Sequence, residues 1–162
     1  VFELYFPVIA QQITETTRQP SLENLLGQGE TILIVDDEKE QREILGNVLS
    51  RLGYKAEMVG CGEKAVEFIK TNSVDLIVLD MVMSPGMNGY RTLKAIREIN
   101  PVQKAVITSG QLNHPDRPKT EALGISKYLG KPLTLSQLAQ TIQEEIRVGN
   151  VSLAPESHLP KQ

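Results

Sequence analysis

Two short apolar runs that end in aspartate constrain this chain more than any other feature. TILIVDDE at 31–38 carries Asp36 and Asp37, and VDLIVLD at 74–80 ends in Asp80. Each run is too short for a helix and too uniformly apolar for a half-exposed strand, so each predicts a strand covered on both faces. Such strands are typical of parallel sheets, where the ligand crevice lies beyond the carboxyl ends of the strands. If the two strands are neighbours, we expect the three carboxylates to lie together at that end of the sheet.

Three converging carboxylates repel one another, which raises the pKa of at least one of them unless a cation is present. An all-oxygen site with few protein ligands suits Mg2+. A single aspartate at a strand end would more often cap the next helix. The set as a whole favours a cation site, because Ser109 in AVITSG at 105–110 and Lys131 in YLGKPL at 128–133 are expected at the same level of the sheet.

These residues resemble those of the CheY-like receiver domains of two-component response regulators, and the resemblance covers about residues 31–147. In that family an aspartate at the end of the third strand accepts a phosphoryl group from a phosphohistidine, a position matched by Asp80. The family's acidic pair holds Mg2+, which implies this role for Asp37 directly and for Asp36 through water. Asp80 and the backbone carbonyl of Val82 would complete the ligand set.

The resemblance also assigns the residues around the phosphoryl group. Ser109 and Lys131 match the hydroxyl and the lysine that bind phosphoryl oxygens, and Tyr128 with Ser109 would form the switch that relays phosphorylation to the signalling face. Thr108 is a second candidate for the hydroxyl role, although a hydroxyl followed by a small residue fits Ser109 and Gly110 better.

Phosphoryl transfer needs mainly in-line positioning and charge neutralisation from the protein. Asp80 would be the nucleophile that forms an acyl phosphate, and Mg2+ would offset the charge as the donor phosphate approaches. With apolar Val82 and neutral Gln111 beside the site, we expect slow self-dephosphorylation. A phosphohydrolase would need a general acid where Val82 stands. An interaction module without the chemistry is disfavoured, because every position that the reaction needs is filled.

Helical and strand-like segments alternate along the chain. Helices are expected from Glu38 to Leu52, Glu63 to Lys70, Arg91 to Ile99 and Leu135 to Ile146, with a weaker strand at 54–59. On the first of these helices the apolar positions are Ile44, Leu45, Val48, Leu49 and Leu52. The alternation predicts a doubly wound α/β fold, a five-stranded parallel sheet with helices on both faces. The resemblance implies the flavodoxin-like strand order 2-1-3-4-5.

Two segments depart from the family pattern. The loop DMVMSPGMNG at 80–89 looks one residue longer than usual near Ser84, and turns at Pro85–Gly86 and Asn88–Gly89 would absorb the insertion without moving Asp80. Pro115 and Pro118 exclude a regular helix before about Pro118, so the fourth helix should be short. We therefore expect an unusual partner surface there.

Composition limits the kinds of binding partner and the cellular compartment that we expect for this chain. The net charge of −3 and the lack of a basic cluster argue against direct nucleic-acid contact. No apolar stretch is long enough to cross a membrane, and the single cysteine, Cys61, suits a reducing cytoplasm. His114 and His158 lie in Pro-containing polar stretches and are not expected to donate phosphate.

The ends of the chain point to a longer parent protein. Residues 1–8, VFELYFPV, resemble the last strand of the ATP-binding domain in hybrid sensor histidine kinases, which implies a linker at 9–30, a receiver at 31–147 and a disordered tail at 148–162. The parent, which could be membrane-anchored, would then be a histidine kinase, although no kinase core is present here. A free-standing single-domain regulator is the alternative, and the apolar N-terminal strand could pair with a second copy. Expected partners are a phosphohistidine-bearing kinase or phosphotransfer domain and a downstream signalling protein.

Overall fold

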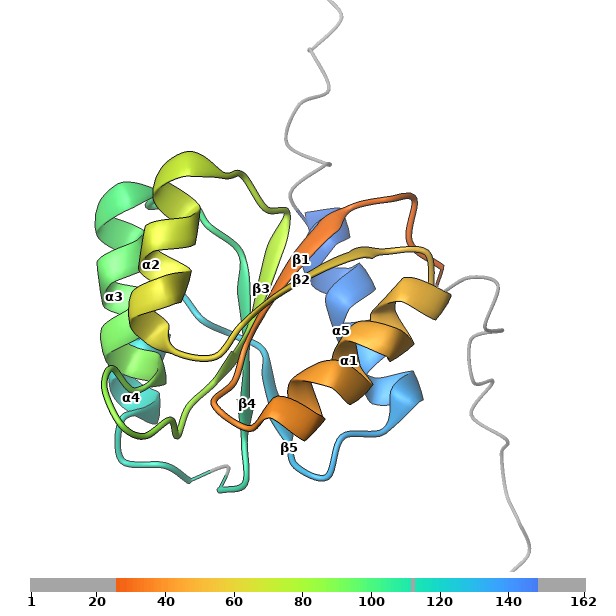
Figure 1. Cartoon of the computed structure of the whole chain (residues 1–162). Helices are drawn as coiled ribbons and strands as arrows, with labels where there is room; N and C mark the ends of the chain where they lie inside the picture. The colour runs from red at the N-terminus through yellow and green to blue at the C-terminus, as the bar shows by residue number, and fades with distance from the viewer. Residues whose placement is uncertain (1–25, 112, 149–162) are drawn as a thin grey trace, which may run out of the picture.

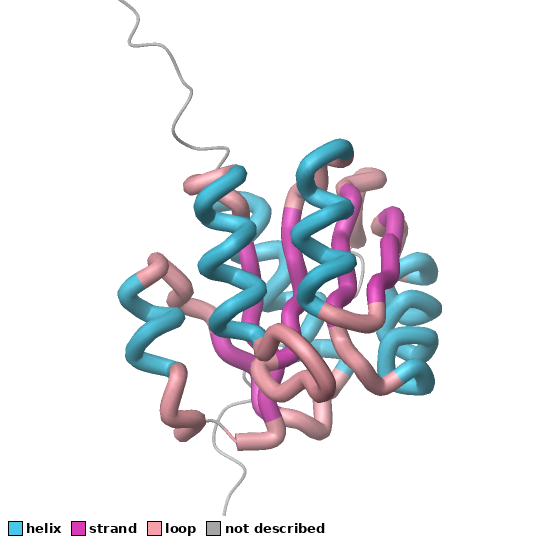
Figure 2. Tube along the Cα trace, turned by 60° about the vertical axis from the view of Figure 1, so that its left-hand side comes forward, coloured by secondary structure: helices cyan, strands magenta, loops and turns pink. Residues whose placement is uncertain are grey.

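The computed structural model describes residues 26–111 and 113–148, which form a five-stranded sheet between two layers of helices (Figure 1). In chain order the elements are β1 (Thr31–Val35), α1 (Lys39–Arg51), β2 (Lys55–Val59), α2 (Gly62–Thr71), β3 (Leu76–Asp80), α3 (Gly89–Ile99), β4 (Ala105–Ser109), α4 (Arg117–Ala122), β5 (Tyr128–Gly130) and α5 (Leu135–Val148). The tube in Figure 2 shows helices on both sides of the strands.

All strands of the sheet pair in parallel, in the order β2-β1-β3-β4-β5. The predicted fold class and strand order are therefore confirmed. Val35 of β1 lies opposite Leu79 of β3, so the residues that follow β1 emerge beside the end of β3. The strand order reverses between these two strands, which is where ligands bind in open α/β sheets.

Alternate residues of the central strands serve two separate cores. On the face covered by α1 and α5, the buried side chains include Ile32, Ile34, Leu49, Val78 and Ile142. The opposite face, covered by α2, α3 and the segment after α4, buries Leu33, Ile77, Leu79, Leu93, Ile96 and Ile125, among others. Because both faces are covered, the strands read as continuous apolar runs in the sequence.

Two helices show where the sequence patterns hold and where they fail. The short fourth helix is confirmed, since α4 has six residues and begins with Pro118 in its first turn. On α1, by contrast, Ile44 is 63% exposed while Leu45 and Leu49 are buried. The expected apolar face of this helix was too wide, because Ile44 lies about 100° around the helix from Leu45, beyond the stripe that meets the sheet.

Residues 27–29 are fixed to the turn between α1 and β2. The Gly27 amide donates to the Leu52 carbonyl at 2.7 Å, and the Gly29 amide donates to the Gly53 carbonyl at 3.1 Å. A Cβ atom on Gly27 would lie 2.5 Å from the Tyr54 ring, so only glycine allows this close approach. The proposed strand at 1–8, the linker up to residue 25 and the tail from 149 lie outside the described residues, and α5 extends to Val148.

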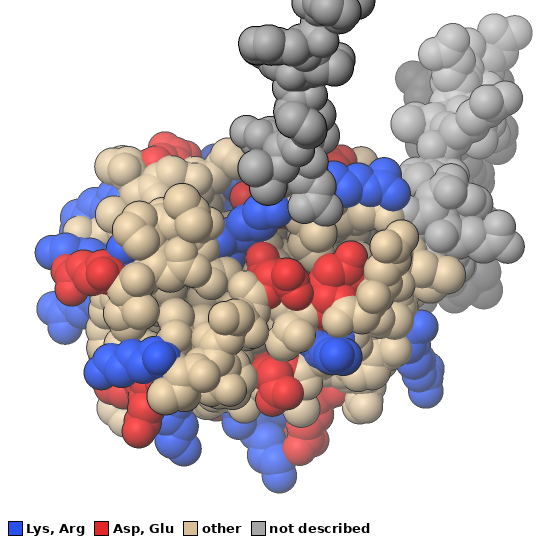
Figure 3. Space-filling model, turned by 90° about the horizontal axis from the view of Figure 1, so that it is seen from above, with Lys and Arg blue, Asp and Glu red and all other residues tan. Residues whose placement is uncertain are grey.

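The described surface carries mixed charge. Viewed from the end of the sheet at which β1 begins, acidic and basic side chains are interspersed over the visible face (Figure 3). Within residues 26–111 and 113–148, no helix has the length and hydropathy needed to cross a bilayer.

Candidate functional site

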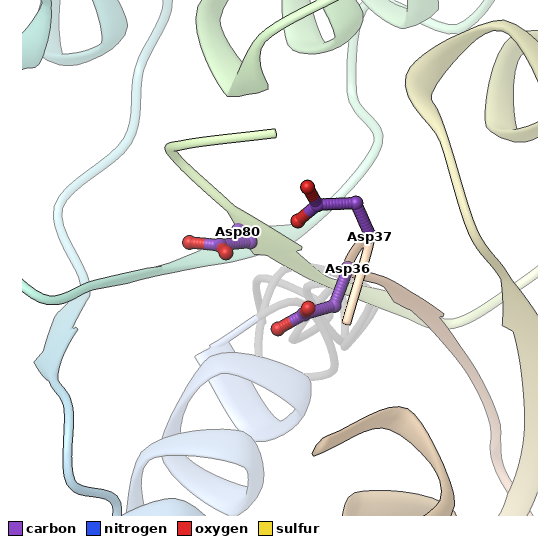
Figure 4. A group of neighbouring side chains, drawn as sticks. All are labelled: Asp36, Asp37 and Asp80. Atoms are coloured by element: carbon purple, nitrogen blue, oxygen red, sulfur yellow. The ribbon is translucent and has the colours of Figure 1, made fainter. Parts of the chain in front are cut away.

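Three aspartates meet at the carboxyl ends of β1 and β3. Asp36 and Asp37 follow β1 directly and Asp80 is the last residue of β3, and one carboxylate oxygen of each lies within 4.8 Å of the others. Figure 4 shows the three carboxylates turned toward the same side of the strand ends. Asp36 and Asp80 are 2% and 6% exposed, whereas Asp37 faces solvent. The cluster is therefore open to solvent at Asp37.

Lys131 connects the two buried carboxylates. Its Nζ atom donates to Oδ2 of Asp36 and to Oδ2 of Asp80, each at 2.8 Å. The lysine follows β5 immediately, and its backbone amide donates to the Ser109 carbonyl at 2.9 Å, which fixes the start of the side chain at the end of the sheet. One ammonium thus bonds two of the three carboxylates in the cluster.

The electrostatics of the site follow from this imbalance. Burial raises the pKa of Asp80, and the nearby Asp36 charge adds to this, while the hydrogen bond from Lys131 offsets part of the rise. Burial also acts to lower the pKa of Lys131, but its bonds to Asp36 and Asp80 outweigh burial, so the pKa is raised and the side chain stays charged. The surplus negative charge and the oxygen-only donor set could hold a hard divalent metal ion.

Ser109 lies at the same level but its hydroxyl turns away. Ser109 is 4% exposed at the end of β4. Its Oγ atom donates to the Gln111 carbonyl at 2.8 Å and accepts from the Gln111 amide at 3.1 Å. Among the described residues these bonds go to the loop after β4 and not to Asp80. A role in binding phosphoryl oxygens would require a rotation of this side chain.

Tyr128, at the start of β5, is joined to α4. Its hydroxyl lies 2.7 Å from Oγ1 of Thr120 and donates to the Arg117 carbonyl at 3.4 Å. The Arg117 guanidinium lies 4.3 Å from the centre of the Tyr128 ring, a cation–π distance. The ring is half-buried. The residue expected to act as a switch is thus held by the short fourth helix.

Residues 32–143 match the family described as response regulator receiver domain. The chain belongs to this family. Receiver domains serve two-component systems, and the acidic cluster lies within the matched segment. The half-exposed Val82, whose amide donates to Oδ1 of Asp80 at 3.3 Å, also falls in this segment.

Relatives of this receiver domain include both sensor kinases and regulators. LuxN of Vibrio campbellii, an autoinducer 1 sensor kinase/phosphatase, is 31% identical over 174 residues that cover 96% of this chain and 20% of LuxN. YvrH of Bacillus subtilis, a transcriptional regulatory protein, is 34% identical over 118 residues, covering 72% of this chain and 49% of YvrH. The chain therefore spans a fifth of one relative and about half of the other.

A solved structure is similar in fold to this receiver domain. Response regulator TrrA of Thermotoga maritima, solved in complex with Mg2+-BeF, has a TM-score of 0.64 and 26% identity, covering 71% of this chain and 97% of TrrA. The similarity extends across nearly all of TrrA.

Two contacts around the loop after Asp80 could not be found from the sequence. Oδ2 of Asp37 accepts a hydrogen bond from the Ser84 amide at 3.0 Å, and Oε1 of Glu63 accepts one from the Met87 amide at 2.8 Å. The partners are 47 and 24 residues apart. Only turn-forming residues marked the loop in the sequence, and such residues do not say which side chains hold a loop.

Proposed function

We propose that this receiver domain accepts a phosphoryl group on Asp80 from a phosphohistidine. One observation carries the proposal: Lys131 donates to Asp80 and Asp36 together, with the Asp37 carboxylate close by. Burial, with a smaller contribution from the Asp36 charge, raises the pKa of Asp80, and a further cation nearby would favour the charged carboxylate. Lys131, together with a cation held by the acids, would neutralise the charge of a transferred phosphoryl group.

The phosphoryl group would move from the histidine nitrogen to a carboxylate oxygen of Asp80. A carboxylate oxygen of Asp80 attacks phosphorus and forms an O–P bond, while the N–P bond of the phosphohistidine breaks and the imidazole leaves with the electron pair and takes up a proton. The Lys131 ammonium can stay near the transferred oxygens, because it already lies 2.8 Å from Asp80. Its positive charge then offsets the charge that arrives with the phosphoryl group.

The donor set fits Mg2+. Asp37, Asp80 and the Val82 carbonyl would hold the ion directly and Asp36 through water, and the bound ion would supply charge neutralisation. A divalent hard cation matches oxygen ligands and the surplus of negative charge in the cluster.

Ser109 and Tyr128 would convert phosphorylation into a change at the surface. Ser109 would leave Gln111 and turn toward the new phosphoryl oxygens, which it could do by rotation about its side chain. Tyr128 would follow at the face formed by β5 and α4, where it now bonds Thr120. That face would meet the downstream signalling protein, and a homodimer could use the same surface.

The chain would act as the C-terminal receiver of a hybrid histidine kinase and would lie in the cytoplasm, also where the parent kinase is anchored in a membrane. Supporting this context, the similarity to LuxN extends over 96% of the chain, more than the receiver needs. Residues 1–8 would then be the last strand of the kinase ATP-binding domain and 9–30 the linker, of which residues 27–29 are bonded to the receiver. The disordered tail expected at 148–162 would begin one residue later, because Val148 belongs to α5. A free-standing single-domain regulator is the second candidate, supported by the similarity to TrrA, which is matched over 97% of its chain.

The deciding experiment is intact-protein mass after incubation with acetyl phosphate and Mg2+, in which acetate is the leaving group. We expect one phosphoryl adduct on the wild type, and none with EDTA or in an Asp80→Asn variant. An adduct that persists in Asp80→Asn would move the acceptor to another residue. No adduct under any condition would favour the interaction-module alternative.

A further inference from the structure

Two hydrogen bonds, called ties below, hold the loop between β3 and α3 to the rest of the domain. On one side the Ser84 amide donates to the carboxylate of Asp37 at 3.0 Å, and on the other the Met87 amide donates to the carboxylate of Glu63 at 2.8 Å. Between the two ties lie Pro85 and Gly86, both exposed. Residues 84–87 of this loop are therefore held by one carboxylate of the acidic cluster and by one carboxylate of α2.

The contact with α2 is closely fitted. A Cβ atom on Gly86, whose φ is +112°, would lie 2.7 Å from Oε1 of Glu63. A Cβ atom on Gly62 would lie 2.8 Å from the Met87 Cβ and 1.9 Å from Oγ1 of Thr92. Glycine at both positions lets the start of α2 approach the loop and α3 directly. The position of Glu63 is thus fixed by two close contacts, that of Gly62 with Thr92 and Met87 and that of Gly86 with Glu63 itself.

The carboxylate of Glu63 is suited to this task even though it is exposed. Hydrogen bonds from its own backbone amide and from the Met87 amide hold its pKa below the ordinary value, so it remains ionised and able to accept. A charged acceptor forms a stronger bond to an amide than a neutral one. Glu67, one turn further along α2, is exposed and serves as a matched position without such a tie.

We propose that Glu63 is a positioning residue for the metal site, holding the loop after Asp80 so that the Val82 backbone stays beside the acidic cluster. The inference rests on the proposed function, because Asp37 would serve both the loop and the cation. The negative charge of Asp37 would then be shared between the cation and the Ser84 amide, which weakens the hydrogen bond to Ser84. The tie from Glu63 to Met87 does not involve the cluster and keeps the loop in place.

The test is Mg2+ binding by titration calorimetry on the 162-residue chain, with Glu63→Ala, Glu63→Gln and Glu67→Ala variants. Glu63→Ala should weaken Mg2+ binding by roughly fivefold. Glu63→Gln should stay close to the wild type, since its amide oxygen still accepts from Met87, and Glu67→Ala should have no effect. Hydrogen exchange at the Met87 amide should become faster in Glu63→Ala alone.

Three results would overturn the inference. Unchanged Mg2+ affinity in Glu63→Ala would show that the tie is not needed. An equal loss in Glu63→Gln, or in Glu67→Ala, would assign the effect to charge alone. Phosphorylation is measured separately in the same samples. If Mg2+ affinity changes across the Glu63 variants as expected but no adduct forms, the acceptor role of Asp80 is refuted and the positioning role of Glu63 is supported. If the adduct forms but all variants bind Mg2+ equally, the acceptor role is supported and the positioning role is refuted.

Discussion

The Nζ atom of Lys131 lies 2.8 Å from a carboxylate oxygen of Asp80, although 51 residues separate the two in the chain. Parallel pairing of β3, β4 and β5 creates this contact, because it aligns the carboxyl ends of the three strands. The same ammonium bonds Asp36, so one cation compensates two buried acids. The stability of the metal-free domain should therefore depend on this lysine.

Replacing Lys131 with glutamine should lower the free energy of unfolding by roughly 2–3 kcal/mol without metal, because two largely buried carboxylates lose their counter-charge. Urea denaturation in EDTA measures the change, and added Mg2+ should restore part of it. Lys127→Gln is the control, since Lys127 pairs with Glu144 at the surface and should contribute less than about 1 kcal/mol. Equal losses in the two variants would contradict the expected role of Lys131.

Asp80→Asn should raise the midpoint of thermal unfolding in EDTA near neutral pH. Burial raises the pKa of Asp80 above its ordinary value of 3.8, which means that the folded state disfavours the charged carboxylate. The neutral amide removes this penalty while keeping the shape of the side chain. With Mg2+ present the higher unfolding midpoint of the variant should shrink or reverse. The wild type keeps the Asp80 carboxylate as a proposed ligand, so bound Mg2+ stabilises it more than the variant. An unfolding midpoint below that of the wild type in EDTA would refute the prediction.

Tyr128→Phe should cost about 1 kcal/mol of unfolding free energy at pH 7, the contribution of the hydroxyl bond to Thr120. Burial raises the pKa of the Tyr128 phenol above its ordinary value of 10.0, partly offset by that bond. A raised folded-state pKa gives stability that is present below pH 10 and lost as the pH rises through the folded value. The difference between wild type and variant should therefore shrink above pH 10, as followed by urea denaturation across pH.

Truncation of two aliphatic side chains on α1 should change the free energy of unfolding by very different amounts. Leu49→Ala should cost about 2–5 kcal/mol, because its side chain is fully buried against the sheet. Ile44→Ala should change stability by less than about 0.5 kcal/mol, because Ile44 is 63% exposed. Guanidinium denaturation of both variants checks the pair, and a large loss in Ile44→Ala would place that side chain in a core.

If Asp80 accepts a phosphoryl group as proposed, the adduct should be long-lived. The side chain two residues beyond the acceptor is Val82, which is 55% exposed and apolar, and Gln111 is neutral and exposed. Neither can act as a base for an attacking water. Decay of the intact-mass adduct after removal of acetyl phosphate measures the lifetime, and loss within seconds would refute this expectation.

Most of the fold could be predicted from the sequence, because its signals are local. Apolar runs bounded by Asp37 and Asp80 mark strands covered on both faces, and helical spacing marks the segments between them. The meeting of the acids then follows from parallel pairing together with the strand order, which the family resemblance supplied and which places β1 beside β3. The breadth of the buried face of α1 did not follow, since Ile44 fits helical periodicity but lies outside the stripe that contacts the sheet.

The finer geometry of the candidate site depends on rotamers and loop paths, which no residue pattern encodes. The resemblance gives Ser109 a role but not its present hydrogen bonds to Gln111. In the same way, the contact between Glu63 and Met87 joins a helix start to a loop 24 residues away. Such contacts are fixed by the packing of elements after they form.

The anchoring of Gly27 and Gly29 to the turn after α1 has a consequence for intramolecular signalling. It fixes the point of attachment of any N-terminal neighbour at the end of β1 opposite to the acidic cluster. A donor histidine in the same polypeptide would have to pass the length of that strand, roughly 17 Å for five residues. Connector length would therefore decide whether phosphate moves within one polypeptide or between two.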